Sequence, residues 1–231
     1  SASQSGYFLA MDFLSLLPVL ILSIVVHEVA HAWVALREGD DTAQRLGRIT
    51  LNPLSHMDML GSFLVPFALY FMADGMILGW AKPVPINPGK FRDYRSGDIK
   101  VSLAGIVSNV LLAVIFTFLV ILLLKIQMSA VGGDAVLDFM IRMARFGIFI
   151  NLILAVFNLI PIPPLDGSHV VYHLLPPRWG DIYRRAGRYG MILLLGLVFF
   201  YPPFFIFALQ PVFVLMGFAD ALIYNLSFWG G

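Results

Sequence analysis

Three ionisable side chains, His27, Glu28 and His31, stand within five residues of one another in the apolar stretch VVHEVAHAW. On an α-helix, residues four positions apart lie on one face, so both imidazoles can reach the same ion. Glu28 is then placed to take a proton from an attacking water and pass it to a leaving amine. The simpler alternative is that these side chains only pack on a helix face. Because ionisable groups are costly in a lipid-embedded helix, the metal site is favoured.

A catalytic zinc site usually has three protein ligands, so the two histidines need a third oxygen or nitrogen donor. Asp166 is the candidate, since it follows a long apolar run in the proline-rich stretch PIPPLDG. Those prolines cannot continue a helix, and they leave backbone groups free at a depth where only a polar cavity could accommodate them. The alternative is that Asp166 is an ordinary N-cap of a helix that starts near Ser168.

The composition indicates which elements must hold these groups. Hydrophobic residues make up 59% of the 231-residue chain and charged residues 13%, against roughly 45–50% and about 25% in soluble domains. We therefore expect an all-α polytopic membrane protein. The net charge of +1 argues against a nucleic-acid partner. The absence of cysteine leaves only nitrogen and oxygen ligands for a metal.

Three long apolar runs, residues 13–36, 101–126 and 140–160, predict a core of three transmembrane helices. Residues 189–231 add further C-terminal apolar helices, which cross the bilayer once or twice. We expect a single membrane-embedded domain over residues 1–231. Within residues 1–10, Ser1 to Gly6 look like an artificial extension introduced by cloning, and Met11 is a plausible native start.

The placement of basic residues predicts the topology. If the apolar block 59–79 re-enters the membrane without crossing it, Lys125, Arg142 and Arg145 lie on one side and the other 12 of the 15 basic residues on the other. If that block crosses, the division is 9 to 6. The positive-inside rule favours the re-entrant segment, with the larger group in the cytosol.

The region between the first two spans, residues 37–100, is expected to face the cytosol. The alternating stretch RLGRITL at residues 45–51 predicts a short strand, and residues 80–87 a partner, which together make a small β-hairpin or sheet. A helical substrate must unwind before its carbonyls can be attacked, and it could then bind as an added strand. Ile49, Thr50 and Leu51 are therefore predicted substrate-binding residues.

Several motifs in this order resemble the site-2 protease family of intramembrane metalloproteases. HEVAH precedes NLIPIPPLDG at residues 158–167, and three more stretches match between them: GRITLNPLSHMD, GWAKPVPINP and SLAGIVSN. The resemblance covers residues 25–173. One departure is Ile106, where the family more often has proline. Because no PDZ or CBS module is recognisable, the chain looks like a minimal member.

The resemblance implies roles for individual residues. His27, His31 and Asp166 would bind Zn²⁺, and Glu28 would be the general base. Asn158 would orient the substrate or stabilise the developing oxyanion.

Two further residues receive secondary roles. Asn109 is counted with the substrate-binding residues, although its position suits a structural polar contact, and the departure at Ile106 weakens its assignment. His169 is a candidate to support the Asp166 ligand through a hydrogen bond.

These observations predict a zinc metalloendopeptidase that cuts the transmembrane segments of other membrane proteins in regulated intramembrane proteolysis. Its partners would be a single-span substrate and the bilayer, in a bacterial or archaeal inner or plasma membrane, with the active site open to the cytosol. The main alternative is a non-catalytic metal- or substrate-binding protein, either an inactive relative or a transporter. A transporter would be expected to show repeat symmetry, which is not seen. A hydrolase of lipids or small amides would share the zinc chemistry.

Overall fold

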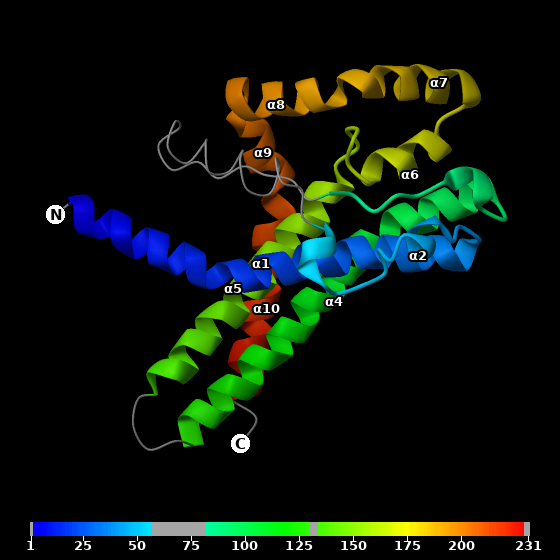
Figure 1. Cartoon of the computed structure of the whole chain (residues 1–231). Helices are drawn as coiled ribbons and strands as arrows, with labels where there is room; N and C mark the ends of the chain where they lie inside the picture. The colour runs from blue at the N-terminus through cyan, green and yellow to red at the C-terminus, as the bar shows by residue number, and fades with distance from the viewer. Residues whose placement is uncertain (1, 57–81, 130–133, 229–231) are drawn as a thin grey trace. The chain divides into compact units, whose positions relative to one another are not determined.

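The computed structural model describes residues 2–56, 82–129 and 134–228, and in these ranges the chain forms helices and no β-strand (Figure 1). The elements in chain order are α1 (Ala2–Glu38), α2 (Thr42–Arg45), η1 (Pro53–His56), η3 (Pro88–Lys90), α4 (Tyr94–Ser129), α5 (Ala135–Leu159), α6 (Gly167–Leu174), α7 (Pro177–Ala186), η4 (Gly187–Tyr189), α8 (Gly190–Phe200), α9 (Pro202–Ala208) and α10 (Gln210–Phe228). The all-α class predicted from composition is confirmed.

Four stretches in the described ranges are long and apolar enough to cross a bilayer: Leu16–Glu38, Tyr94–Ser129, Ala135–Leu159 and Pro202–Ser227. The first three correspond to the three runs predicted from the sequence, and the fourth combines α9 and α10. Each has more than the ~20 residues needed for about 30 Å of hydrocarbon. The chain is therefore a multi-pass integral membrane protein.

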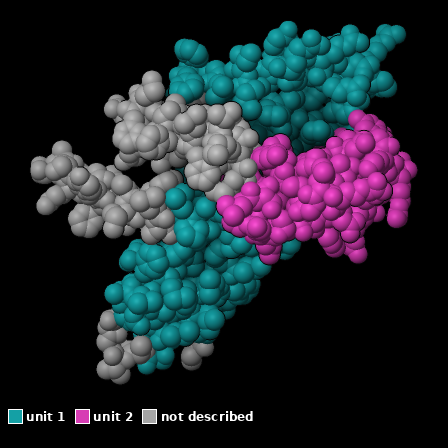
Figure 2. All heavy atoms as spheres, viewed as in Figure 1, with its two compact units in different colours: residues 1–23, 106–231 teal, residues 24–105 magenta. Residues whose placement is uncertain are grey.

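The chain divides into two compact units, residues 1–23 with 106–231 and residues 24–105 (Figure 2). In the first unit, α5 packs against α10 and the 106–129 part of α4. The buried side chains at these contacts include Val120, Ile148, Leu152, Val212 and Ile223. Because lipid tails are as apolar as these side chains, their association depends on close packing and interhelical hydrogen bonds rather than on the hydrophobic effect.

A polar triad at the centre of the first unit supplies such hydrogen bonds. Ser23, Asn109 and Asn151 come from α1, α4 and α5, and all three are fully buried. The Asn109 amide donates to the Asn151 carbonyl oxygen at 2.8 Å, and the Asn151 amide donates to Ser23 Oγ at 2.8 Å. Ser23 Oγ in turn donates to the Val19 carbonyl. These hydrogen bonds fix the register of α1, α4 and α5 relative to one another at this point.

In the second unit, a buried carboxylate joins the end of α1 to the segment before η3. Asp40 accepts hydrogen bonds from the backbone amides of Thr42 (3.0 Å) and Asn87 (2.6 Å), and Lys90 Nζ lies 3.6 Å from it. Burial alone would raise the pKa of Asp40, but these donors outweigh it and lower the pKa below its ordinary value of 3.8. Its contribution to stability is therefore present above pH 3.8 and is lost as the pH falls through the lowered pKa.

The predicted β-hairpin in the region 37–100 is wrong for the described residues. Residues 42–45 form α2, and the chain then turns, with hydrogen bonds from the Gly47 amide to Gln44 and from the Arg48 amide to Ala43. Gly47 has φ +63°, a left-handed conformation that interrupts a strand. Residues 82–87 have no regular secondary structure, and Pro83 and Pro85 lack the N–H groups that a ladder needs. The predicted re-entrant segment, 59–79, lies outside the described residues.

The triad predicts an asymmetry between single and double substitutions. Replacing Asn151 by leucine leaves the Asn109 amide without its Asn151 acceptor, and we expect a loss of about 1–3 kcal/mol in the free energy of unfolding. Replacing Asn109 and Asn151 together by leucine removes both partners and should cost less than the sum of the two single changes. Thermal unfolding in detergent of the wild type, both single variants and the double variant measures this. Strict additivity would show that the two amides do not interact.

Candidate metal centre

The two histidines of the H-E-x-x-H motif lie one turn apart on α1 and are both buried, with 8% and 7% of their surface exposed. His27 Nε2 and His31 Nε2 are 3.0 Å apart, and the two rings meet edge to face. A single helix thus directs two imidazole nitrogens to one point, as the i, i+4 spacing predicts.

A backbone carbonyl fixes the tautomer of the neutral His31 ring. Its Nδ1 lies 2.7 Å from the carbonyl oxygen of Val101 in α4. Because a carbonyl oxygen can only accept, Nδ1 must carry the proton, and the neutral ring then presents the lone pair of Nε2. This is the arrangement in which a second partner orients a metal-binding histidine.

Gly105, also on α4, leaves the space that the two imidazoles occupy. A Cβ atom built on Gly105 would lie 2.4 Å from both His27 Cε1 and His31 Nε2. No carbon atom can approach a ring so closely, so any side chain at this position would displace the histidines. The close approach of α4 to α1 at this point therefore requires glycine.

The carboxylate of Glu28 is held by the extended segment at residues 82–87. Its Oε2 accepts a hydrogen bond of 2.9 Å from the backbone N–H of Val84. Val84 lies between Pro83 and Pro85, which have no N–H group, so it provides the only backbone donor of these three residues. The side chain of Val84 is buried against Ala32 and Ala43, which fixes the segment beside α1.

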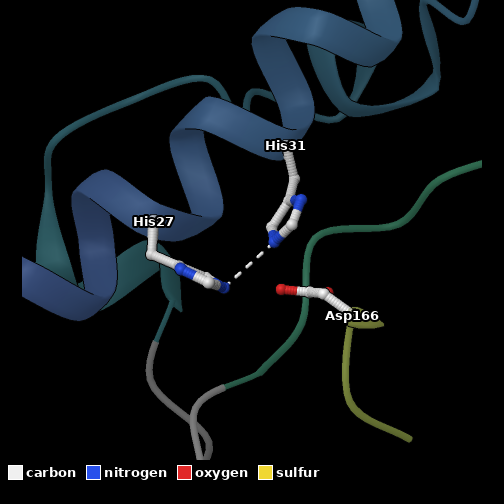
Figure 3. A group of neighbouring side chains, drawn as sticks. All are labelled: His27, His31 and Asp166. Atoms are coloured by element: carbon white, nitrogen blue, oxygen red, sulfur yellow. Dashed lines mark hydrogen bonds between the residues drawn. The ribbon is translucent and has the colours of Figure 1, made fainter. Parts of the chain in front are cut away.

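Asp166 completes a group of three potential ligands. One nitrogen of each histidine and one carboxylate oxygen of Asp166 lie within 4.8 Å of one another (Figure 3). The alternative that Asp166 is an ordinary N-cap is not supported, because its side chain makes no capping hydrogen bond to α6. Two imidazoles and a carboxylate are a donor set typical of catalytic zinc, which leaves a coordination position open. The residues present therefore fit a zinc ion.

Comparison with known protein families shows which family the chain belongs to. The sequence model of the family described as "Peptidase family M50" matches residues 15–200. The chain belongs to this family. The resemblance to site-2 proteases inferred from the motifs is thereby confirmed.

Several relatives of this M50 chain are described as candidate zinc metalloproteases. YwhC of Bacillus subtilis (strain 168) is 39% identical over 206 residues, which cover 86% of this chain and 87% of YwhC. Rip2 of Mycolicibacterium smegmatis is 28% identical over 178 residues, covering 77% of this chain and 64% of Rip2. A Methanocaldococcus jannaschii protein is 36% identical over 108 residues, covering 42% of this chain and 51% of its own length. No solved structure matches the chain.

The other residues that the sequence assigns to the M50 site have various environments. Asn158 is half-buried near the end of α5, and its amide donates to the Leu154 carbonyl at 2.9 Å. Asn109 is fully buried in the polar triad. The side chain of His169 is exposed on α6, and its backbone amide donates to the Asp166 carbonyl. Their assigned roles stay predictions.

The predicted substrate-binding residues lie in the irregular segment between α2 and η1. Ile49 packs against the cluster of Ala32, Ala43 and Val84. Thr50 Oγ1 accepts from the Asn52 amide, and Leu51 is largely exposed. Their role in binding substrate also stays a prediction, although not as part of a strand.

Sequence reasoning missed the groups that hold this site in place. The Val84 amide and the Val101 carbonyl belong to the backbone, so the residue type at either position gives no sign of their role. Two signals were available: the Pro-Val-Pro sequence at 83–85, which isolates one N–H group, and the glycine within SLAGIVSN.

Gly105 provides a sharp test of the metal centre. Replacing Gly105 by alanine should weaken zinc affinity by about ten-fold or more, because the added methyl group displaces both imidazoles. The matched control is Gly217→Ala in α10, where a Cβ atom meets nothing within 4 Å. Zinc titration with a competing chelator measures both variants. Equal affinity in the two would mean that Gly105 does not shape the site.

The hydrogen bond to Glu28 predicts a second effect. Val84→Pro removes the N–H donor. We expect about a 100-fold fall in kcat with zinc content unchanged, because misplacing a catalytic group by about 1 Å lowers the rate by about that factor. Val84→Ala keeps the N–H group and removes only side-chain packing, so it should retain far more activity. Similar losses in both variants would assign the effect to packing instead.

Proposed function

We propose that this chain is a zinc metalloprotease that hydrolyses peptide bonds in or near the transmembrane segments of other membrane proteins. The proposal rests on the grouping of His27, His31 and Asp166. The two histidines and Glu28, which is held by the Val84 amide, lie on α1, a candidate membrane span. Membership in a peptidase family and the names of the relatives support the same chemistry.

His27, His31 and Asp166 would hold the ion. A bound zinc ion supplies a Lewis acid that polarises the scissile carbonyl and makes a water acidic enough to attack at neutral pH. Glu28 adjoins the first histidine, so it acts as the general base that takes the proton of the attacking water and delivers it to the leaving amine. The Val84 N–H keeps this carboxylate in one orientation.

Asn158 is the proposed contact to the substrate carbonyl. Its amide group bonds to the Leu154 carbonyl through one of its two N–H groups. The second N–H group is the one that would donate to the developing oxyanion.

The substrate proposal follows from where the site lies. His27 and Glu28 fall within the span Leu16–Glu38, so a peptide bond reaches them only from within or beside the bilayer. A transmembrane helix has to unwind locally, because its carbonyls are occupied by i to i−4 hydrogen bonds. We place this reaction in regulated intramembrane proteolysis of single-span proteins, with the site open to the cytosolic face of a bacterial or archaeal membrane.

The test compares wild type with Glu28→Gln, both purified in detergent. Metal content is measured by mass spectrometry, and cleavage is measured on a panel of single-span substrates and on a soluble peptide of the same sequence. We expect about one zinc per chain in both proteins, and a rate at least about 100-fold lower for the variant.

Glu38→Gln is the matched control. It makes the same chemical change on the same helix, at a residue paired with Lys100 instead of lying at the site. Its activity should equal that of the wild type. Zinc in neither protein would refute the ligand assignment, zinc with no cleavage of any substrate would favour a binding protein, and cleavage of the soluble peptide alone would refute the substrate class.

A further inference from the structure

Helix α7 carries an apolar stripe that faces away from the protein. Trp179, Ile182 and Ala186 follow one another at spacings of three and four residues, so they share one face of the helix. Trp179 is 64% exposed and Ile182 57%, although both side chains are strongly apolar. Tyr189 in η4 continues this exposed aromatic surface. Tryptophan and tyrosine rings favour the membrane–water boundary. Whatever covers this surface of α7 must therefore offer both apolar and polar groups.

The same segment is strongly basic. Residues 176–190 contain Arg178, Arg184, Arg185 and Arg188 and one acidic residue, Asp181, for a net charge of 4 − 1 = +3. Arg184 lies 3.5 Å from Asp181. Within the described ranges, no carboxylate pairs with Arg178 or Arg185, and both side chains are exposed. The surface therefore complements a negatively charged occupant.

The element after α7 sets its depth in the membrane. α8 consists of eleven residues, GMILLLGLVFF, without a single polar side chain, and most of them are exposed, including Ile192 at 69% and Phe200 at 88%. Such a surface favours contact with lipid over contact with water, although eleven residues are too few to cross the bilayer. Since α8 follows α7 directly through η4 and continues it nearly in line (Figure 1), the arginine-bearing helix lies close to the hydrocarbon layer.

The side of α7 next to this stripe is fixed to the protein. The Tyr183 hydroxyl donates to the Pro161 carbonyl at 2.8 Å, and the buried Gly180 lies against Tyr172. Burial raises the pKa of Tyr183, so it stays a neutral donor at physiological pH. These contacts fix the rotation of α7 about its axis, and at this rotation Trp179 and Ile182 are exposed.

We propose that α7 lies in the membrane–water interface, with Trp179 and Ile182 in the boundary of the acyl chains and its arginines on the phosphates of anionic phospholipids. Helices of this composition bury their apolar face about 5–10 Å into that boundary. Basic residues at an anionic surface each strengthen binding roughly five-fold. This inference does not depend on proteolytic activity.

The first part of the test is depth. Because the chain contains no cysteine, single cysteines at Ile182 and at its neighbour Asp181 can carry nitroxide spin labels in the full-length protein in nanodiscs. We expect the label at 182 to collide with oxygen and to be shielded from a water-soluble nickel chelate, and the label at 181 to show the reverse. Equal access of the chelate to both sites, or protection of 182 from both reagents by a covering protein surface, would overturn the proposal.

The second part is lipid charge. We expect the wild type to be enriched in phosphatidylglycerol over phosphatidylcholine when it is extracted from mixed nanodiscs and its bound lipids are quantified by mass spectrometry. The variant with Arg178→Gln, Arg185→Gln and Arg188→Gln should lose this preference by roughly ten-fold or more. The matched control changes Arg37, Arg45 and Arg95 to glutamine. An unchanged preference in the first variant, or an equal loss in the control, would refute anionic-lipid binding by α7.

Discussion

An asparagine, histidine or glutamate in a lipid-embedded helix cannot exchange hydrogen bonds with water, so it must find its partner within the protein. The arrangement of the helices follows from this constraint. In one unit, Ser23, Asn109 and Asn151 satisfy one another across three helices. In the other, Val101 in α4 and Val84 in the segment 82–87 supply backbone groups to His31 and Glu28. Apolar packing then fills the space between these fixed points.

The metal centre combines a rigid element with less regular ones. Helix α1 carries both histidines and the glutamate, and its geometry alone sets their spacing. The orientations of His31 and Glu28 are set from outside the helix, by one carbonyl and one amide of the backbone. Apart from a change to proline at the amide donor, no substitution removes such a backbone group. The centre is therefore most vulnerable where a substitution changes the backbone itself or the space beside it.

The sequence predicts those parts of the protein that depend on local pattern. The long apolar runs and the H-E-x-x-H spacing are local properties, so the helices and the histidine pair follow directly from them. The stretch RLGRITL alternates like a strand, but a left-handed conformation at Gly47 and the return bond from Arg48 to Ala43 override that pattern. The partner of Asn109 lies 42 residues away in sequence, so the pairing depends on the register between α4 and α5, which no local pattern encodes.

The polar triad also constrains the order in which the chain can be assembled. Ser23 is synthesised first, and Asn151, which donates to it, follows 128 residues later. Until the third span enters the bilayer, the Asn109 amide lacks its Asn151 acceptor. A nascent chain with two inserted spans therefore lacks both hydrogen bonds that Asn151 makes to the other two members of the triad, and these form only when α5 arrives.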